Sequence, residues 1–583
     1  MRTRIRHHCD VPRTRPVRPA GLLAMALAVA IGAWPATPVH AAGTVPLIEK
    51  REERPAPAVW LVDYFGESGA AANTWPARHA TQLREFYGAG GFLPRWTSDE
   101  GMTGRGTALL NALARVDEHG LSPDALGVPA LQALAQRPEP AARMQLELGL
   151  SSAFLRLAGW LLGTEREEGA PRHPVFVLPV DSASPQELSR LLDTAEVPVV
   201  LAALAPANSQ YQRLLAARQV YKAMADRRPE WPVVPQGDTI RAGRWDVRVS
   251  VVRRRMAAAG AAVDGTGDAN RYDPKLREAV MRFQASQGLE ADGNIGRATV
   301  NAMNAGPAER LAAIDATLER WRRMPRDLGA RYVLVNIPAY RMAVMDGDRP
   351  ALEMKVIVGM RARPTPTFSS RIGGVEINPT WSVPAKLAIE DIVPAIRRNP
   401  NYLEEHNIRV LASIDGRTRE IHPGEIDWET QGRRLPFRFR QDPGAGNSLG
   451  KVKMVFPNDE SIYLHDTPKR SLFGLTMRAQ SSGCIRLEKP GEFADMLLRQ
   501  GAGWDAEQIG AAFARSTTRA VPLRDGLPIH IAYLTAWVDD QGKVAFHDDI
   551  YDQDRRVLQM LQARRALPAP TAGDRVRTAS AER

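Results

Sequence analysis

A histidine ends the apolar run Ile462-Tyr463-Leu464-His465, and nineteen residues later a cysteine follows the turn Ser481-Ser482-Gly483. The apolar run is typical of a buried strand, and the small residues of the second stretch are typical of a tight turn. A thiol with the usual pKa of about 8.5 is mostly protonated at neutral pH, but a neighbouring imidazole can accept its proton and yield a reactive thiolate. The pattern therefore indicates Cys484 as a nucleophile and His465 as its base. The alternative is an inert cysteine beside a structural histidine.

The rest of the chain makes this cysteine unusual. The 583 residues include only two cysteines, Cys9 and Cys484, which excludes a disulfide-stapled scaffold and any multi-cysteine metal site. Residues 1–41 are predicted to be a signal peptide, because six arginines and an apolar run precede small residues around Ala41. The run, Gly21 to Trp34, has 14 residues and is too short for a comfortable membrane span, although an uncleaved anchor is the alternative. Cleavage would leave Cys484 as the single cysteine of an exported chain.

The charge pattern does not favour nucleic-acid binding. The formal net charge of +11 comes from 77 Lys and Arg against 66 Asp and Glu. Residues 1–41 carry six Arg and one Asp, so their removal takes away five net positive charges and leaves +6. The densest basic run, Arg253 to Arg255, lies in an amphipathic helical pattern and is expected to form a solvated helix face. A mildly basic surface suits an anionic polymer as a partner.

Helical and strand patterns divide the chain into segments. Residues 58–225 carry apolar residues at three- and four-residue spacing and are predicted to form a helical scaffold domain. Residues 330–505 contain β-branched strand patterns, interrupted at about 385–440 by helical, Arg-rich sequence that we interpret as an insertion or cap. A C-terminal segment, 528–556, is predicted to form strands that pack on the catalytic or scaffold region, with one pair running from Ile529 to Trp537 and from Lys543 to His547. The last residues, 567–583, are predicted to be a disordered tail.

A small helical unit is predicted at 241–306. It contains Phe283-Gln284, Gly288-Leu289, the turn Asp292-Gly293-Asn294-Ile295-Gly296, and Thr299. A helix should end at Gly288 and another should begin near Thr299, which predicts a compact three-helix module with an anchored turn. These residues resemble the peptidoglycan-binding domain of bacterial wall enzymes. A helical linker domain is the alternative.

The stretch around His465 and Cys484 resembles the active-site signature of YkuD-type L,D-transpeptidases. In that signature a histidine is followed by a spacer and by Ser/Thr-His-Gly-Cys. His465 matches the catalytic proton donor and acceptor, Cys484 the nucleophile, Gly483 the preceding glycine and Ser481 the leading hydroxyl residue. The match thus covers the histidine, the leading hydroxyl residue, the glycine and the cysteine of the signature.

Two positions depart from the common signature and narrow the subgroup. Ser482 stands where the pattern has His, and Arg486 where it often has Asn, and both are features of the long, Gram-negative, scaffold-bearing branch. The resemblance implies a multidomain α+β protein with a mainly β catalytic domain carrying a helical insertion, a three-helix peptidoglycan-binding module and a helical scaffold domain. It also implies a periplasmic protein of cell-wall biogenesis and cell shape.

The implied reaction is the formation of 3→3 peptidoglycan cross-links. Cys484 would attack the carbonyl before the terminal D-alanine of a tetrapeptide stem, and His465 would protonate the leaving amine. The thioester would then pass to the side-chain amine of a second stem. No metal or organic cofactor is implied, and the family is acylated by carbapenems. Donor and acceptor stems are the expected partners, with other wall-synthesis enzymes as further candidates and with membrane contact only if the N-terminal segment stays uncleaved.

Further candidate site residues surround this pair. The backbone amides of Gly483 and Cys484 are plausible donors to an oxyanion, and Arg486 could hold a substrate carboxylate. The complete set of predicted substrate-binding residues is Arg486, Tyr463, Trp381, Asn447 and Ser482. Aromatic core, a turn cap and a surface ion pair are the alternative roles. Asp466 should point away from His465, because adjacent strand residues face opposite sides, so a backbone carbonyl is expected to orient the imidazole.

Two other functions remain open at the level of sequence. An L,D-carboxypeptidase would follow the same acyl-enzyme path with water as the acceptor. A non-catalytic peptidoglycan-binding protein would keep the fold without the reaction, although the Cys484–His465 pair argues against it. Nothing in the sequence separates transfer from hydrolysis.

Overall fold

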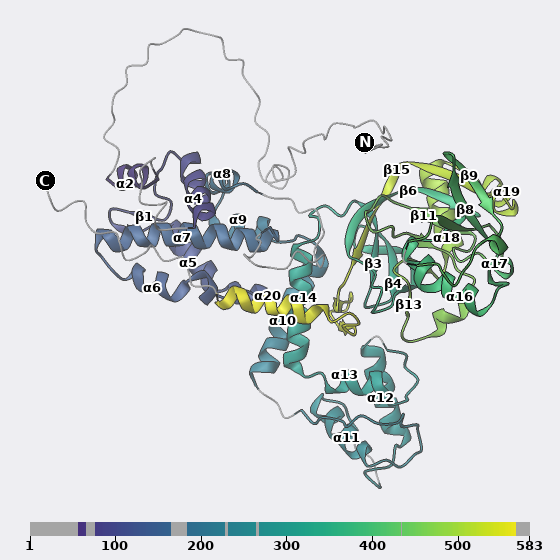
Figure 1. Cartoon of the computed structure of the whole chain (residues 1–583). Helices are drawn as coiled ribbons and strands as arrows, with labels where there is room; N and C mark the ends of the chain where they lie inside the picture. The colour runs from purple at the N-terminus through teal and green to yellow at the C-terminus, as the bar shows by residue number, and fades with distance from the viewer. Residues whose placement is uncertain are drawn as a thin grey trace. The chain divides into compact units, whose positions relative to one another are not determined.

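The computed structural model describes residues 56–65, 76–164, 183–227, 231–263, 267–287, 289–432 and 434–566 (Figure 1). The predicted signal peptide at 1–41, the predicted helix end at Gly288 and the predicted tail at 567–583 lie outside these ranges. Within them, no helix has both the length and the hydropathy needed to cross a membrane. All features below belong to the compact unit Pro57–Arg583.

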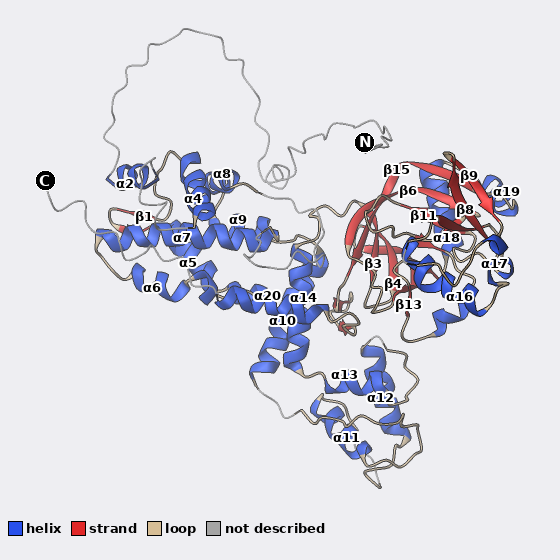
Figure 2. Ribbon diagram, viewed as in Figure 1, coloured by secondary structure: helices blue, strands red, loops and turns tan. Residues whose placement is uncertain are grey.

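The N-terminal segment is helical, as its periodicity predicts (Figure 2). Its longest helix, α7, is buried along most of its length because apolar residues occupy nearly every face from Leu146 to Leu162. Packed around it are shorter helices that contribute to one shared hydrophobic core. The helices are α2 (Ala56–Phe65), α4 (Ala77–Ala89), α5 (Gly104–Ala114), α6 (Val128–Ala135), α7 (Pro140–Leu162), α8 (Pro185–Thr194), α9 (Val197–Leu204), α10 (Ser209–Asp226) and α14 (Pro307–Arg322).

The small module contains three helices, α11 (Arg248–Ala258), α12 (Pro274–Ser286) and α13 (Arg297–Asn304). Gln284, on α12, anchors the turn that the motif predicts: its amide nitrogen donates to Asn294 O at 2.8 Å and to Thr299 Oγ1 at 3.1 Å. Its amide oxygen accepts the Gly293 N–H at 2.8 Å. Gly293 has φ = +73°, a conformation that favours glycine. The predicted three-helix module is confirmed. The motif residues Gly293, Asn294 and Thr299 share one partner, the buried Gln284, which accounts for their spacing in the sequence.

Residues 331–532 contain a nine-stranded sheet with the order β13-β5-β14-β12-β11-β6-β15-β3-β4. Pairing between β4 and β5 joins the sheet back on itself around a buried core. The sheet combines parallel and antiparallel pairs. It brings strands that are distant in sequence side by side, as in the parallel pair of β15 and β3. The strands are β3 (Arg331–Asn336), β4 (Arg341–Asp346), β5 (Arg349–Gly359), β6 (Phe368–Ile377), β11 (Val452–Val455), β12 (Leu464–His465), β13 (Ala479–Ser481), β14 (Ile485–Leu487) and β15 (Arg519–Ala532), and helices α18 (Pro490–Leu497) and α19 (Ala506–Ala514) follow β14.

The insertion is more than helical. Besides α15 (Ala385–Leu387), α16 (Val393–Arg398), α17 (Tyr402–Glu405) and a π-helix at Ala388–Ile392, it contains a four-stranded sheet ordered β7-β10-β8-β9. These strands are β7 (Trp381–Ser382), β8 (Ile408–Ile414), β9 (Arg417–Ile421) and β10 (Phe437–Gln441). Buried residues that include Val410 and Phe439 form a separate hydrophobic core. We call this part, residues 381–441, the cap.

The C-terminal segment differs from its prediction. The expected strand from Ile529 to Trp537 is split, because β15 ends at Ala532 and a short hairpin of β16 (Ala536–Val538) and β17 (Val544–Phe546) begins after it. At the break, the Asn336 side chain takes over the backbone of Leu534: it donates to Leu534 O and accepts the Leu534 N–H, both at 3.0 Å. A side chain thus replaces a strand partner here, which no local pattern reveals. Helix α20 (Gln553–Ala566) follows.

Candidate active site

Strand pairing brings the histidine and the cysteine together. β12 and β14 run parallel, with Leu464 opposite Ile485 and His465 opposite Arg486. The Ile485 N–H donates to Tyr463 O at 3.1 Å and extends this register by one residue. Because side chains alternate along a strand, Tyr463 and His465 share one face with Cys484 and Arg486. The site therefore lies on one side of two adjacent strands.

The Cys484 thiol is half-buried and has both a hydrogen-bond acceptor and hydrogen-bond donors around it. Its Sγ lies 3.8 Å from Ser461 O, and both the backbone N–H and the hydroxyl of Tyr463 interact with it. Burial raises the pKa of the thiol, while Tyr463 and the cations of Lys453 and Arg486 oppose that shift without reversing it. At neutral pH the resting group is therefore the thiol and not the thiolate.

The His465 imidazole is buried and oriented by the main chain. Its Nδ1 lies 2.5 Å from Asp466 O, and because a carbonyl only accepts, Nδ1 carries the proton and Nε2 is the basic nitrogen. The expectation that a backbone carbonyl orients this ring is confirmed. Burial, reinforced by the positive charge of Arg486, lowers the pKa of His465 to about 3. The imidazole and the thiol, which share one face of the strand pair, are thus both neutral at rest.

The depressed pKa of His465 has a consequence for stability. In the unfolded chain this imidazole takes up a proton below its ordinary value of 6.5, whereas in the fold it stays neutral down to about 3. Between these values the unfolded state binds more protons, so stability falls as the pH falls. We therefore expect the free energy of unfolding to fall less steeply with decreasing pH in the His465→Gln variant than in the wild type. Between pH 6 and 4 the difference in slope should be about 1.4 kcal/mol per pH unit. Urea unfolding at several pH values measures this slope.

The matched control is His406→Gln, which changes an exposed histidine in the cap. Its slope should follow the wild type. An unchanged slope in His465→Gln would show that this imidazole is not held neutral by the fold.

The loop before the cysteine is held by its own serine. Ser481 Oγ donates to Cys484 O at 2.6 Å and accepts the Gly483 N–H at 3.2 Å. Gly483 has φ = +120°, which a residue with a side chain rarely adopts. Because the Gly483 amide is engaged inside the loop, it is not offered to a substrate in this state. The Cys484 amide donates to no group among the described residues, so of the two predicted oxyanion donors this one is open, and the assignment of both stays a prediction.

Arg486, Tyr463 and Trp381 lie together around the thiol. The Trp381 indole, from the first strand of the cap, interacts with the Tyr463 hydroxyl, which in turn interacts with Cys484. The Nε and Nη1 atoms of Arg486 are buried without a hydrogen-bond partner among the described residues. A buried guanidinium without a partner is costly, so an anionic group is the expected complement. The structure thus brings three of the five predicted substrate-binding residues to the nucleophile.

Asn447 and Ser482 occupy different positions. Asn447 is buried, its Nδ2 donates to Asp442 O at 2.9 Å, and its Oδ1 accepts the Leu449 N–H at 2.8 Å. It caps its own loop, and this geometry lends no support to substrate binding, which stays a prediction. Ser482 is exposed beside the nucleophile, where its Oγ accepts from Arg363 at 3.0 Å.

Two cationic residues near the site escape sequence inspection. Lys453 lies opposite His465 in the antiparallel pair of β11 and β12, 4.7 Å from the centre of the Tyr463 ring, and pairs with Glu376 at 3.0 Å. Its charge opposes protonation of His465. The alternation of side chains along Val452–Val455 predicts which face of the sheet Lys453 occupies. Only the strand register shows that Lys453 lies opposite a residue of β12.

Arg363 connects the loop 481–484, which we call the nucleophile loop, to the cap. Besides Ser482, its guanidinium pairs with Glu390 and Asp391 in the cap's π-helix, each at 2.7 Å. Arg363 and Ser482 lie more than a hundred residues apart in the sequence, so no spacing pattern could identify their contact.

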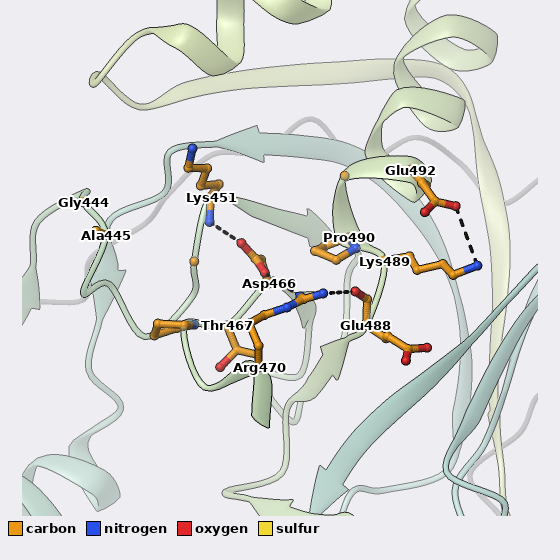
Figure 3. A pocket seen from close by; sticks show the side chains of 13 residues that line it. Gly444, Ala445, Lys451, Asp466, Thr467, Arg470, Glu488, Lys489, Pro490 and Glu492 are labelled. Carbon is orange, nitrogen blue, oxygen red and sulfur yellow. Dashed lines mark hydrogen bonds and ion pairs between the residues drawn. The ribbon is translucent and has the colours of Figure 1, made fainter. Parts of the chain in front are cut away.

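The Asp466 carboxylate faces away from the site, toward a cavity of about 810 Å³ (Figure 3). It accepts the Lys451 N–H at 2.9 Å and pairs with Arg470 at 3.3 Å. This geometry confirms that Asp466 does not form a triad with His465. The cavity wall mixes the charges of Lys451, Arg470 and Glu488.

Family comparisons agree with this geometry. Residues 330–531 match the YkuD family, described as the L,D-transpeptidase catalytic domain. The chain carries an L,D-transpeptidase catalytic domain. Residues 81–217 match the scaffold domain family, and residues 247–303 match the peptidoglycan-binding domain family. The L,D-transpeptidase domain thus occurs with the two companion domains that the sequence predicts.

Individual relatives are similar to parts of this chain. A curated Haemophilus influenzae protein, named as an L,D-transpeptidase, is 39% identical over 226 residues, which are 39% of this chain and 45% of that protein. The chain thus spans less than half the length of that relative. An L,D-transpeptidase from Mycobacterium smegmatis is similar at 13% identity and a TM-score of 0.17, covering 34% of this chain and 58% of its own. One from Stackebrandtia nassauensis is similar at 10% identity and a TM-score of 0.18, covering 51% and 96%.

Proposed function

We propose that this protein forms 3→3 peptidoglycan cross-links through a thioester on Cys484, using tetrapeptide stems as donors. The observation that carries the proposal is the grouping of Cys484, neutral His465 and Arg486 on one face of β12 and β14, where two buried guanidinium nitrogens of Arg486 have no hydrogen-bond partner among the described residues. This set supplies a nucleophile, its base and a cationic hydrogen-bond donor for a substrate carboxylate. The catalytic and peptidoglycan-binding domains agree on peptidoglycan as the substrate class.

The first half-reaction acylates the cysteine. His465 Nε2 takes the thiol proton as Sγ attacks the carbonyl carbon before the terminal D-alanine, and a C–S bond forms. The oxyanion is stabilised by the open Cys484 amide, and Arg486 binds a stem carboxylate. The C–N bond then breaks, and the leaving nitrogen takes the proton from His465. D-alanine departs and the thioester remains.

The second half-reaction consumes the thioester. The side-chain amine of a diaminoacyl residue on another stem attacks the same carbonyl and gives a proton to His465. The C–S bond breaks, and the returning thiol takes that proton, so the enzyme is regenerated. Because the imidazole is neutral at rest, its Nε2 lone pair is free to take a proton at each attack. Export to the periplasm, through the predicted signal at 1–41, is part of the proposal.

The products of the reaction test the proposal. Purified enzyme incubated with disaccharide-tetrapeptides is expected to release D-alanine and to form tetrapeptide–tripeptide dimers with a 3→3 bond. Mass spectrometry of the muropeptides identifies the linkage. Tripeptides without dimers would show that water is the acceptor and would assign an L,D-carboxypeptidase, whereas unchanged tetrapeptides would refute both.

A further inference from the structure

The nucleophile loop is held from outside by one turn, residues 360–365, between β5 and β6. The Met360 N–H donates to Ser481 O at 2.8 Å, and Arg363 donates to Ser482 Oγ at 3.0 Å. The Thr365 hydroxyl donates to Gly483 O at 2.7 Å. Each of the three residues before Cys484 therefore has its own contact to this turn. We call residues 360–365 the bracing turn.

The Thr365 hydroxyl is directed by its surroundings. The side chain is fully buried, and its Oγ1 accepts the Gly359 N–H at 2.8 Å. Because a hydroxyl has one hydrogen, this arrangement commits that hydrogen to Gly483 O. The bond is therefore fixed in direction as well as in distance.

Gly483 O belongs to the same peptide unit as the Cys484 N–H. A trans peptide is planar, so its carbonyl and its N–H point in opposite directions. Anchoring the oxygen on Thr365 aims the Cys484 N–H away from the bracing turn. Gly483 alone cannot fix this plane, because its φ of +120° lies in a region open to glycine but without a strong local preference.

The bracing turn is itself supported from beyond the matched catalytic domain, which ends at residue 531. The Tyr551 hydroxyl donates to Gly359 O and accepts the Thr365 N–H at 3.3 Å. The Tyr551 ring stacks on Tyr533 with centres 5.6 Å apart, and the Tyr551 N–H donates to the Tyr533 hydroxyl at 2.9 Å. The C-terminal segment thus reaches the turn that holds the nucleophile loop.

We infer that Thr365 is a positioning residue that aims the Cys484 amide at the oxyanion, and that Tyr551 supports it from the C-terminal segment. This inference rests on the proposed function, because it concerns the acylation step of that reaction. It predicts a separation between two reactions of the same thiol. Acylation passes through an oxyanion and needs the amide, whereas alkylation by iodoacetamide passes through no oxyanion.

The test uses the full mature chain and two probes, meropenem for acylation and iodoacetamide for alkylation, both followed by intact mass. Thr365→Val keeps the shape of the side chain but removes the hydroxyl. It is expected to slow acylation by about 10- to 100-fold, since one oxyanion donor is worth about 10²- to 10³-fold and here it is misaimed instead of removed. Alkylation should stay within about twofold. Thr365→Ser, which keeps the hydroxyl, should restore acylation, and Tyr551→Phe should slow it by a smaller factor.

Each outcome decides a question. Wild-type acylation rates in Thr365→Val, or an equal loss of acylation and alkylation, would overturn the inference while leaving the proposed function intact. A failure of Thr365→Ser to restore acylation would also overturn it. A wild-type enzyme that gains no adduct would refute the proposed acyl-enzyme, and the inference with it.

Discussion

Replacing Cys484 by alanine is expected to abolish the acyl-enzyme and to lower the rate of cross-linking by at least about 10⁴-fold, since removing a nucleophile from such a site typically costs this much or more. The reason is chemical: His465 can move a proton, but no other described group on this face can form the thioester. Because the predicted mature chain contains Cys484 as its single cysteine, any thiol adduct reports on this residue alone.

Intact mass after incubation with a carbapenem measures the effect. The wild type should gain one adduct and Cys484→Ala none, with the thermal unfolding midpoint unchanged within a few degrees because only a sulfur atom is lost. Met477→Ala, which shortens an exposed side chain in the segment before β13, is the matched control and should still be acylated. An adduct on Cys484→Ala would show that another residue is the nucleophile.

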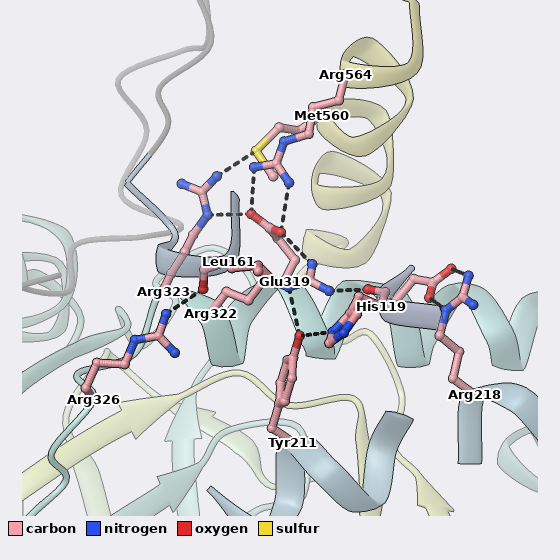
Figure 4. Close-up of polar contacts among 11 residues, drawn as sticks. His119, Leu161, Tyr211, Arg218, Glu319, Arg322, Arg323, Arg326, Met560 and Arg564 are labelled. Carbon is pink, nitrogen blue, oxygen red and sulfur yellow. Dashed lines mark hydrogen bonds and ion pairs between the residues drawn. The ribbon is translucent and has the colours of Figure 1, made fainter. Parts of the chain in front are cut away.

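The second large effect concerns Glu319, a fully buried carboxylate on α14 (Figure 4). It pairs with Arg322 at 3.0 Å, Arg323 at 2.8 Å and Arg564 at 2.9 Å, the last from α20. Burial alone would raise its pKa, but the three guanidinium groups together hold the pKa well below its ordinary value. The carboxylate therefore stays charged and joins the C-terminal helix to α14.

Glu319→Gln is expected to destabilise the protein by about 3–5 kcal/mol, because it removes the negative charge that compensates the fully buried guanidinium of Arg322 and that also pairs with Arg323 and Arg564. Urea unfolding followed by circular dichroism measures the loss. Glu278→Gln is the matched control, since Glu278 pairs with Arg282 at 3.8 Å and both side chains are about 70% exposed. That change should cost less than about 1 kcal/mol. Equal effects in the two variants would contradict a structural role for the buried cluster.

The same cluster connects the scaffold to the catalytic segment through one helix. Arg564 lies near the C-terminal end of α20, and Asp549, before its first turn, accepts the Gln553 N–H at 2.8 Å. Tyr551 lies between these points and supports the bracing turn. Loss of Glu319 should therefore weaken the packing of the C-terminal segment. The Glu319 and Tyr551 variants thus test the role of this segment at two different contacts.

Several elements could be predicted because their signals are local. The order of scaffold, small module and strand-rich segment follows from hydrophobic periodicity, which depends only on neighbouring residues. The Asp-Gly turn of the module and the role of Asp466 also follow from short-range geometry. The predicted strand from Ile529 to Trp537 runs past the end of β15 at Ala532, since the distant Asn336 side chain takes the backbone groups of Leu534.

The sequence by itself indicated the candidate chemistry of this protein: a cysteine after a Ser-Ser-Gly turn, a histidine at a strand end and the residues that carry the family resemblance. Tertiary structure alone decided how that chemistry is arranged. Register placed Lys453 opposite His465, burial set the pKa of His465 to about 3, and the bracing turn oriented the Gly483–Cys484 peptide. These features depend on contacts between residues far apart in the chain, whose energies are set by the folded environment and leave no periodic pattern in the sequence.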